Sequence, residues 1–263
     1  KNFDDQEKKR KSQSHKKKRS AKASDPNGIR PAYWYMDDEV VVGASERPAI
    51  QSAFNVRYKN VMELKPGHAL IIKYNGKVEE LPFIEAREKR ACSFERIYFS
   101  RGNDREIYQE RKKLGHQLAR TALEAVNFDV KNTVFSYIPN TAEAAYYGLM
   151  EGLDAEMNEW KKEQILALGN NITPEKLAEI LRVHSRNEKL VHKDDKQRTF
   201  IADKKSRNSM VGHVYDVTYG ICQDNVDTLV LLDDSIVRGT TLRDSIVSIT
   251  ARLRPKRIII LSS

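Results

Sequence analysis

The sequence predicts an α/β protein with a β-rich first part and a second part built on a parallel sheet. Three observations lead to this prediction. Two strand-like runs at 69–74 and 77–83 flank Asn75-Gly76, a dipeptide typical of β-hairpins. Near residue 96 the pattern changes from short β-type runs to long segments with helical spacing. Residues 228–261 then read as strand, helix and strand, the spacing of a crossover between parallel strands.

The elements of the first part are short. After the turn-forming string Asp25-Pro-Asn-Gly-Ile-Arg-Pro31, a β-branched run at 39–42 precedes the hairpin, and Pro66-Gly67 indicates another turn. We therefore expect antiparallel sheet over 25–85.

The elements of the second part are longer. We expect a short strand at 96–99, a helix of about five turns at 105–126, a buried strand at 133–138 and a helix at 142–153. Residues 154–182 are charged and helical in character, in two pieces divided by Asn170-Asn171 and Pro174, with Thr173 as the cap of the second piece. A strand at 228–232, a loop at 233–239, a helix at 240–253 and a strand at 257–261 follow.

Composition limits the classes of protein that fit. The 263 residues are 40% hydrophobic and contain no apolar run of the ~18 residues that a spanning helix needs. No secretory signal pattern opens the sequence. Cys92 and Cys222 lie far apart and form neither a disulfide framework nor a metal-binding motif. We expect a cytoplasmic protein without a membrane partner.

The net charge of +9 is concentrated at one end. Residues 1–24 hold ten of the 46 Lys and Arg residues and three of the 37 acids, which leaves +2 for the remainder. Such a segment is too polar to form a core, so we expect a disordered tail or loop and, in the main, no nucleic-acid partner.

The candidate chemistry lies where the strand 228–232 ends. Asp233 and Asp234 follow it directly, and Gly239, Thr240 and Thr241 open the next helix. Ligands of parallel sheets bind beyond the carboxyl ends of the strands, and a helix N-terminus with hydroxyls favours a phosphate. Two carboxylates favour sugar hydroxyls or a divalent cation. The pattern predicts a pocket for a sugar monophosphate and magnesium, and lacks both glycine-rich nucleotide-binding motifs.

The string Asp233-Asp-Ser-Ile-Val-Arg-Gly-Thr-Thr241 resembles the phosphoribosyl-pyrophosphate (PRPP) motif of type I phosphoribosyltransferases, in the form found in the glutamine PRPP amidotransferases. Further segments resemble that family in the same order: 25–31, 44–46, 92–100 and 198–201. The resemblance covers most of 25–263 and is patchy between 154 and 190. It implies a Rossmann-like phosphoribosyltransferase domain over 93–263. It also implies part of a β-rich, Ntn-hydrolase-like glutaminase domain over 25–92, preceded by the tail 1–24.

The resemblance also implies roles for particular residues. Asp233 and Asp234 would hold the ribose hydroxyls and lie near Mg²⁺, residues 237–241 would surround the 5′-phosphate, and 138–142 would hold pyrophosphate. Arg198 and Thr199 would belong to a catalytic loop that closes over the substrate. The PRPP-binding residues implied in this way are Asn140, Thr141, Asp233, Asp234, Ser235, Val237, Arg238, Gly239, Thr240 and Thr241.

The implied reaction is attack of ammonia on C1 of PRPP, giving 5-phosphoribosylamine and pyrophosphate in the first step of purine synthesis. Glutamine supplies the ammonia in the complete enzymes. The resemblance also implies a homo-oligomer inhibited by purine nucleotides. The chain as printed has no cysteine near its start, so we expect ammonia-dependent activity without glutamine hydrolysis. Asn140 and Ala142 depart from the acid and the serine common in the family.

Two alternatives share the fold. One is a regulator that binds PRPP without catalysis and contacts nucleic acid through the basic tail. The other is a salvage transferase for a free base. The segments 25–31 and 44–46 favour the amidotransferase over both, because a repressor would carry a winged helix there and salvage enzymes lack the β-rich part.

Overall fold

A computed structural model describes residues 20–73, 75–193, 215–236, 239 and 242–263. The chain forms two compact units, Lys1–Asp104 and Arg105–Ser263. The second unit thus begins after residues 93–104, which the sequence analysis placed in the second domain. In the described part, no helix has the length and apolar character needed to cross a membrane.

The first unit holds two small antiparallel sheets, as predicted. One consists of β1 (Ser20–Ala23), β5 (His68–Ile72) and β6 (Val78–Pro82), in the order β1-β5-β6. The other has the order β3-β2-β4 and consists of β2 (Tyr33–Met36), β3 (Val41–Ala44) and β4 (Met62–Glu63). Strand β1 corrects the expectation that residues up to 24 are all tail, because it pairs with the apolar strand β5 along its whole length.

The strand expected at 39–42 begins two residues later because Asp37 forms a turn. Its Oδ1 accepts hydrogen bonds from the backbone nitrogens of Glu39 and Val40, at 2.9 and 2.8 Å. These bonds hold the two residues out of the strand, so β3 starts at Val41.

Two helical segments of the first unit differ from the sequence prediction. Helix α2 (Arg47–Phe54) was not predicted, although Pro48 in its first turn is a helix-start signal. The segment expected as a strand at 96–99 is the π-helix η2 (Glu95–Phe99). Its aromatic residues pack on one another instead of on a sheet, with the rings of Phe94 and Tyr98 stacked 5.3 Å apart. A further single turn, η1, spans Tyr58–Asn60.

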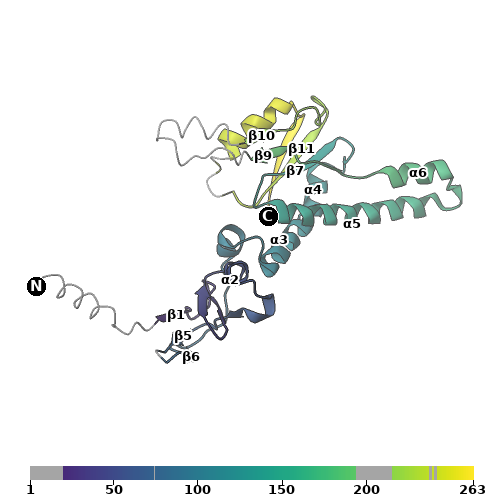
Figure 1. Cartoon of the computed structure of the whole chain (residues 1–263). Helices are drawn as coiled ribbons and strands as arrows, with labels where there is room; N and C mark the ends of the chain where they lie inside the picture. Colours follow the sequence, from purple (N-terminus) through teal and green to yellow (C-terminus); the bar gives the residue numbers. More distant parts are fainter. Residues whose placement is uncertain (1–19, 74, 194–214, 237–238, 240–241) are drawn as a thin grey trace, which may run out of the picture. The chain divides into compact units, whose positions relative to one another are not determined.

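The second unit is built on a four-stranded parallel sheet, which confirms the predicted α/β class (Figure 1). Its strands are β7 (Thr133–Tyr137), β8 (Arg186–Asn187), β11 (Thr228–Asp233) and β12 (Arg257–Ser262), in the order β12-β11-β7-β8. All three neighbouring pairs are parallel. The short antiparallel pair β9 (Val191–Lys193) and β10 (Tyr215–Val217) accompanies it.

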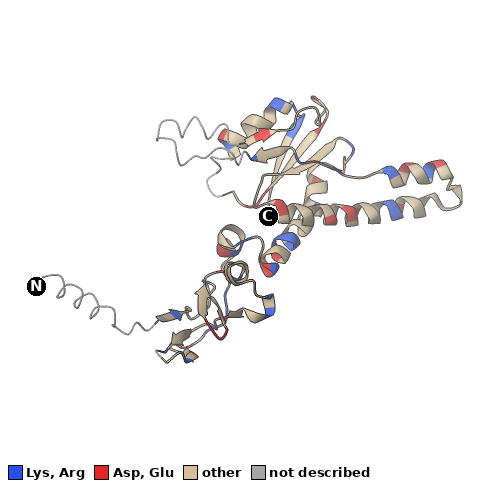
Figure 2. Cartoon of the chain, in the orientation of Figure 1, with Lys and Arg blue, Asp and Glu red and all other residues tan. Residues whose placement is uncertain are grey.

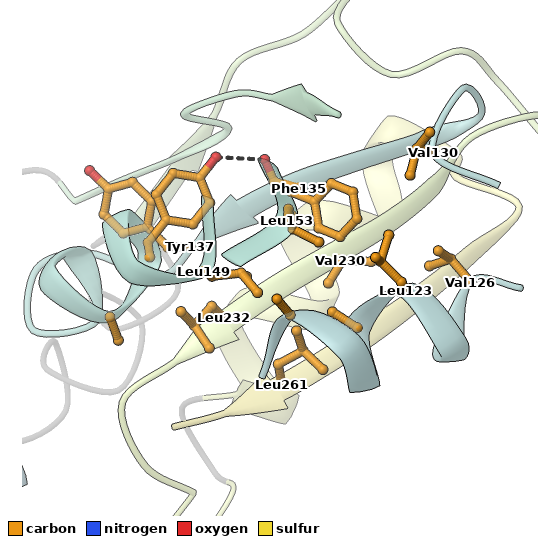
Figure 3. Packing of buried hydrophobic residues seen from close by; sticks show 14 of the residues in the cluster. Leu123, Val126, Val130, Phe135, Tyr137, Leu149, Leu153, Val230, Leu232 and Leu261 are labelled. Atoms are coloured by element: carbon orange, nitrogen blue, oxygen red, sulfur yellow. Dashed lines mark hydrogen bonds between the residues drawn. The ribbon is translucent and has the colours of Figure 1, made fainter. Parts of the chain in front are cut away.

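The sheet carries a core on each face, because successive residues of a strand point to opposite sides. Val230 and Leu232 of β11 pack with Phe135 of β7 on one face, in the cluster shown in Figure 3. Leu229 and Leu231 pack into the cluster on the other face. Because both of its faces are buried, the middle of β11 is apolar, which made the strand recognisable from the sequence.

Helices cover both faces of the sheet. The first face carries α4 (Ala119–Ala125) and α5 (Glu143–Leu168), and α3 (Arg105–Gln117) packs along α5. The second face carries η6 (Leu242–Val247), α8 (Ser248–Thr250) and η7 (Ala251–Leu253). The helix predicted at 105–126 is therefore two helices that divide at Leu118, and the one predicted at 240–253 changes between helix types along its length.

Glycines let α3 and α5 approach until their backbones touch. A Cβ atom at Gly148 would overlap the carbonyl oxygen of Lys112, and one at Gly115 would overlap that of Ala145. At Gly152 the carbonyl oxygen of His116 would lie 2.7 Å from such an atom. We call these three glycines the glycine seam. They fix the first half of α5 against α3.

The charged segment 154–182 is helical in two pieces, as predicted, and the two pieces pack as a hairpin. Helix α5 continues to Leu168, the turn η3 (Gly169–Asn171) follows, and α6 (Pro174–Arg182) returns alongside α5 (Figure 1). The Lys176 nitrogen donates to Thr173 Oγ1 at 3.3 Å, which confirms Thr173 as the cap.

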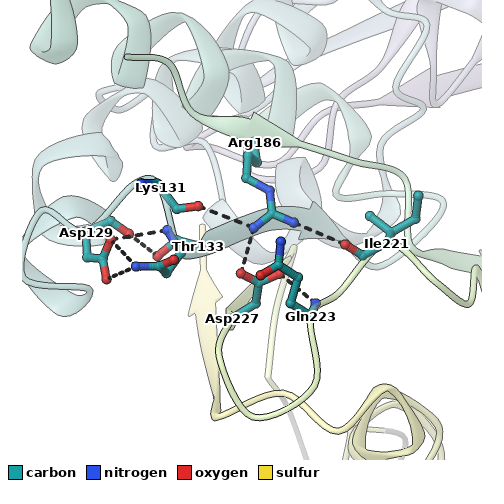
Figure 4. A network of polar contacts seen from close by, with 8 residues as sticks. Asp129, Lys131, Thr133, Arg186, Ile221, Gln223 and Asp227 are labelled. Atoms are coloured by element: carbon teal, nitrogen blue, oxygen red, sulfur yellow. Dashed lines mark hydrogen bonds and ion pairs between the residues drawn. The ribbon is translucent and has the colours of Figure 1, made fainter. Parts of the chain in front are cut away.

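A buried ion pair fastens the edge of the sheet where the strands begin (Figure 4). Asp227, which precedes β11, is completely buried, and its carboxylate accepts a hydrogen bond from Arg186 Nη1 at 2.6 Å. Its other oxygen accepts from the Gln223 nitrogen at 2.8 Å. Arg186 also donates to the carbonyl oxygens of Lys131 and Ile221. The guanidinium thus links the segments around β7, β8 and β11.

Candidate functional site

Two carboxylates stand at the opposite edge of the sheet, where the strands end. Asp233 is the last residue of β11, and Asp234 follows it; both side chains are half-buried. The next strand-end segment is held beside them, because the Ile138 nitrogen donates to the Leu232 carbonyl oxygen at 2.9 Å. Parallel pairing of β11 with β7 therefore brings the aspartates and the loop after β7 to one edge of the sheet.

The two aspartates influence one another strongly. The Asp234 backbone nitrogen donates to Asp233 Oδ1 at 2.9 Å. Burial, and then the hydrogen bond and charge of the Asp234 carboxylate, raise the pKa of Asp233 to about 7. A carboxyl group in this state gains most from a ligand that supplies hydroxyl donors or positive charge.

Residues distant in sequence contribute to the electrostatics of this edge. Burial lowers the pKa of Arg111 of α3, and the charge of Asp234 opposes that effect. Burial, and then the charges of Asp233 and Asp234, raise the pKa of Tyr215 of β10. Sequence analysis missed both residues, because nothing in the local pattern of either segment indicates which strand end it faces.

The loop between β7 and α5 presents polar residues to solvent. Asn140 and Thr141 are exposed, the Pro139–Asn140 peptide bond is cis, and the Glu143 nitrogen donates to the Asn140 carbonyl oxygen at 3.3 Å. Both residues follow β7, which pairs with β11, and their role in PRPP binding stays a prediction.

Glu143, in the first turn of α5, lies next to the loop after β7 and was not singled out from the sequence. Its Oε1 accepts hydrogen bonds from the hydroxyls of Tyr137 and Tyr147, at 3.1 and 3.3 Å. Burial, together with the bond to Glu143, raises the pKa of Tyr137 to about 12. The available signal was an acid at a helix start directly after a polar loop.

The predicted phosphate-binding loop is described only in part. Gly239 has φ of 68°, a conformation that favours glycine, and its carbonyl oxygen accepts from the Arg243 nitrogen at 2.8 Å. Ser235 follows the aspartates and is half-buried. The other predicted residues of this loop and of the catalytic loop lie outside the described residues: Val237, Arg238, Thr240, Thr241, Arg198 and Thr199.

The aspartate pair fits a metal shared with a substrate. Within the residues that the structure describes, no group of three or more His, Cys, Asp or Glu side chains could hold a metal ion alone. Mg²⁺ commonly keeps several waters and takes one or two protein carboxylates together with substrate phosphates. Asp233 and Asp234 provide such a pair, and the raised pKa of Asp233 indicates a position where positive charge would be favourable.

Comparison with known proteins agrees with the resemblance seen in the sequence. The chain is 29% identical over 228 residues to the amidophosphoribosyltransferase of Bacillus subtilis (strain 168), an alignment that covers 84% of this chain. It also resembles the solved structure of the glutamine PRPP amidotransferase from B. subtilis complexed with ADP and GMP. That match has a TM-score of 0.64 and 25% identity over 93% of this chain.

A second solved structure, described as the allosteric regulatory enzyme of purine biosynthesis, matches with a TM-score of 0.65 and 25% identity over 93% of this chain. The chain spans less than half the length of these relatives: 39% of the first, and 46% and 44% of the two solved chains. No family model matches. The comparisons confirm the resemblance to the PRPP amidotransferases.

Proposed function

We propose that the chain transfers ammonia to C1 of PRPP and releases pyrophosphate, the first step of de novo purine synthesis. The observation that carries this proposal is the pair of half-buried carboxylates at the end of β11, beside the polar loop after β7. The similarity to amidophosphoribosyltransferase over 84% of the chain supports the same assignment.

The residues would divide the work between the two ends of the substrate. Asp233 and Asp234 would accept hydrogen bonds from the ribose hydroxyls, and the loop at 138–142 would hold the pyrophosphate. A nitrogen–carbon bond forms at C1 as the bond from C1 to pyrophosphate breaks, and the nitrogen then loses a proton. Positive charge develops on the ribose ring in this step, and carboxylates near the ring stabilise it. Mg²⁺, held by Asp233 and Asp234 with the substrate, would neutralise charge on the leaving group.

The remaining expectations are part of the same proposal. Residues 25–92 would be part of a glutaminase domain, supported by the antiparallel sheets of the first unit and by the length of the alignment. Purine nucleotides would inhibit the enzyme, because the B. subtilis relative was solved with ADP and GMP. We also propose a homo-oligomeric, cytoplasmic enzyme.

The test is pyrophosphate release from PRPP by the purified chain, with Mg²⁺ and with ammonia, glutamine or free purine and pyrimidine bases as acceptors. Ammonia-dependent release at alkaline pH is the expected result. Asp234→Asn should lower the rate by about 10²-fold, as loss of one electrostatic group in a catalytic site does. Asp224→Asn is the matched control, because Asp224 is exposed, pairs with Arg254 and precedes β11, at the opposite edge of the sheet.

Other outcomes separate the alternatives. Release that depends on a free base would replace the proposal with a salvage transferase. PRPP binding without turnover, measured by calorimetry, would favour the regulator. If PRPP does not bind, the assignment of the aspartate pair is wrong.

A further inference from the structure

A cavity of about 370 Å³ lies in the second unit, and its lining residues come from α4, the turn before β7, the second half of α5 and the segment after α6. Because that turn leads into the start of β7, the cavity is at the edge of the sheet opposite the aspartate pair. The proposed function leaves it unused. Most of its wall belongs to the segment 154–190, where the resemblance to the amidotransferases is patchy.

The floor of the cavity is apolar and two of its walls are aromatic. Leu123, Val130 and Met157 are buried beneath it, with 1%, 5% and 7% of their surfaces exposed. Phe128 and Trp160 also line it but keep 46% and 37% of their surfaces exposed. Large aromatic side chains that stay half-exposed around an apolar floor offer a place for a flat or branched apolar group.

Phe128 is held at the cavity by an unusual backbone conformation. Its φ is 59° and that of Asn127 is 53°, a left-handed region that bulky residues rarely adopt. The Phe128 nitrogen donates to the Leu123 carbonyl oxygen at 2.8 Å, which fixes the turn at the end of α4. Strain of this kind persists where the surrounding structure enforces it, so the packing around this turn fixes the position of the ring.

The polar rim of the cavity is acidic. Glu156, Glu159 and Glu163 lie on one face of α5, at spacings of three and four residues, and acidic positions recur along this helix in Figure 2. Arg120 is the one basic residue among the described residues that line the cavity. It pairs with Glu156 at 3.2 Å and lies 5.0 Å from the centre of the Phe128 ring. The lining thus carries a net charge of −2.

The carboxylates of the other two glutamates are available to a ligand. Glu159 forms an ion pair with Lys162 at 3.2 Å. Both side chains are exposed, and ion pairs in water are weak. The side chain of Glu163 forms no ion pair or hydrogen bond with another residue of the described part of the chain. A cation between Trp160 and these carboxylates would interact both with the ring and with the charges.

We infer that this cavity binds a small organic cation with an aromatic or branched apolar body, such as an aryl-alkyl amine. The apolar floor and the rings would take the body, and Glu159 and Glu163 would take the ammonium group. The net negative charge disfavours anions of the same shape, nucleotides included. The inference is independent of the proposed transferase activity.

The test uses phenethylamine as the probe and 3-phenylpropionate as an anion of similar shape. The chain has two tryptophans, so Trp34→Phe leaves Trp160 as the single tryptophan reporter. We expect saturable quenching of Trp160 fluorescence by phenethylamine, weakened by salt, and at least tenfold weaker binding of 3-phenylpropionate. Calorimetry on the unmodified chain measures the same ratio without the reporter.

Variants assign the binding to the cavity. Glu163→Gln should weaken phenethylamine binding about threefold to fivefold, the range for one exposed charge contact. Phe128→Leu should weaken it by a similar factor. Glu151→Gln is the matched control on the same helix, because Glu151 pairs with Lys112 away from the cavity, and it should leave binding unchanged. Far-ultraviolet circular dichroism checks that each variant is folded.

Three results would overturn the inference. Absence of phenethylamine binding in folded, unmodified chain is the first. Equal affinity for the cation and the anion is the second, since it would show an apolar cavity without charge selection. The third is equal weakening by Glu151→Gln and Glu163→Gln, which would place the effect in the overall charge of the chain.

Discussion

Aspartates stand at both ends of strand β11, and their surroundings differ completely. Asp227, before the strand, is fully buried and satisfied by Arg186 and by the Gln223 nitrogen. Asp233 and Asp234, after the strand, lie half-buried against one another, and the pKa of Asp233 is raised. The same residue type thus serves stability where its charge is matched inside the protein. At the other end of the strand the charge is left unmatched, and the proposed ligand would match it.

The largest effect should follow from breaking the matched pair. Arg186→Met removes the guanidinium and leaves the Asp227 carboxylate buried without its cation, so we expect the free energy of unfolding to fall by about 3–5 kcal/mol. Urea denaturation measures the loss. Arg243→Met is the control, because its pair with Asp244 is exposed and should contribute less than about 1 kcal/mol. Similar losses in both variants would contradict the distinction between the two ends of β11.

A pH effect should come from the unmatched pair. Asp233 has a raised pKa of about 7 in the folded chain, against an ordinary value of 3.8. Between these values the folded chain keeps a proton that the unfolded chain releases, so stability falls as the pH rises and levels off above the folded pKa. Partial exposure to solvent reduces the change to about 1–2 kcal/mol.

Comparing the unmodified chain with the variant Asp233→Asn isolates the contribution of Asp233 to the pH dependence of stability. Urea denaturation without metal measures the free energy of unfolding of both proteins at mildly acidic and at mildly alkaline pH. In Asp233→Asn this free energy should not show the fall with rising pH that is expected for the unmodified chain. An identical pH dependence in the unmodified chain and in the variant would show that Asp233 does not carry a raised pKa.

A smaller effect should come from the hydroxyl that holds Glu143 at the loop. Tyr137→Phe removes a hydrogen bond at 3.1 Å, and we expect a stability loss of about 1 kcal/mol. It should also raise the KM for PRPP a few-fold with little change in kcat. Tyr146→Phe is the matched control, since its hydroxyl donates to the Phe135 carbonyl oxygen, and it should lower stability without changing KM. Equal KM changes would assign the effect to general packing.

The smallest effect should be the stability change on neutralising Asp234. Asp234→Asn relieves repulsion between two neighbouring carboxylates, so stability should stay the same or rise by less than about 1 kcal/mol, even though activity falls. Thermal unfolding without ligand measures this. A loss as large as that of Arg186→Met would mean that Asp234 serves stability in the way Asp227 does.

The parts of the fold that the sequence predicted are those with local signals. β11 is apolar because both of its faces are buried, and Thr173 with Pro174 indicates the start of α6. The π-helix at Glu95–Phe99 was mistaken for a strand because aromatic residues favour strands in general. The spacing of four between Phe94 and Tyr98 was the contrary signal, since it places both rings on one helical face.

The residues of the candidate site divide in the same way, into those with a local sequence signal and those without one. Asp233 and Asp234 could be located from sequence because a strand end and a loop define them. Arg111 and Tyr215 could not, because they reach the site through the packing of α3 and β10, elements more than ten residues away in sequence. Glu143 could be identified only from the positions of the two tyrosine hydroxyls that it contacts, and no local sequence pattern gives those positions.

The glycine seam has a practical consequence for engineering. It clamps α5 to α3 only over the first half of the helix, while the turn Gly169–Asn171 at the far end of the hairpin is exposed and a side chain at Gly169 would meet open space. A fluorescent reporter inserted into that turn would lie at the end of the helical hairpin formed by α5 and α6. The contacts of the glycine seam itself would be preserved, because all three glycines precede that turn in the sequence.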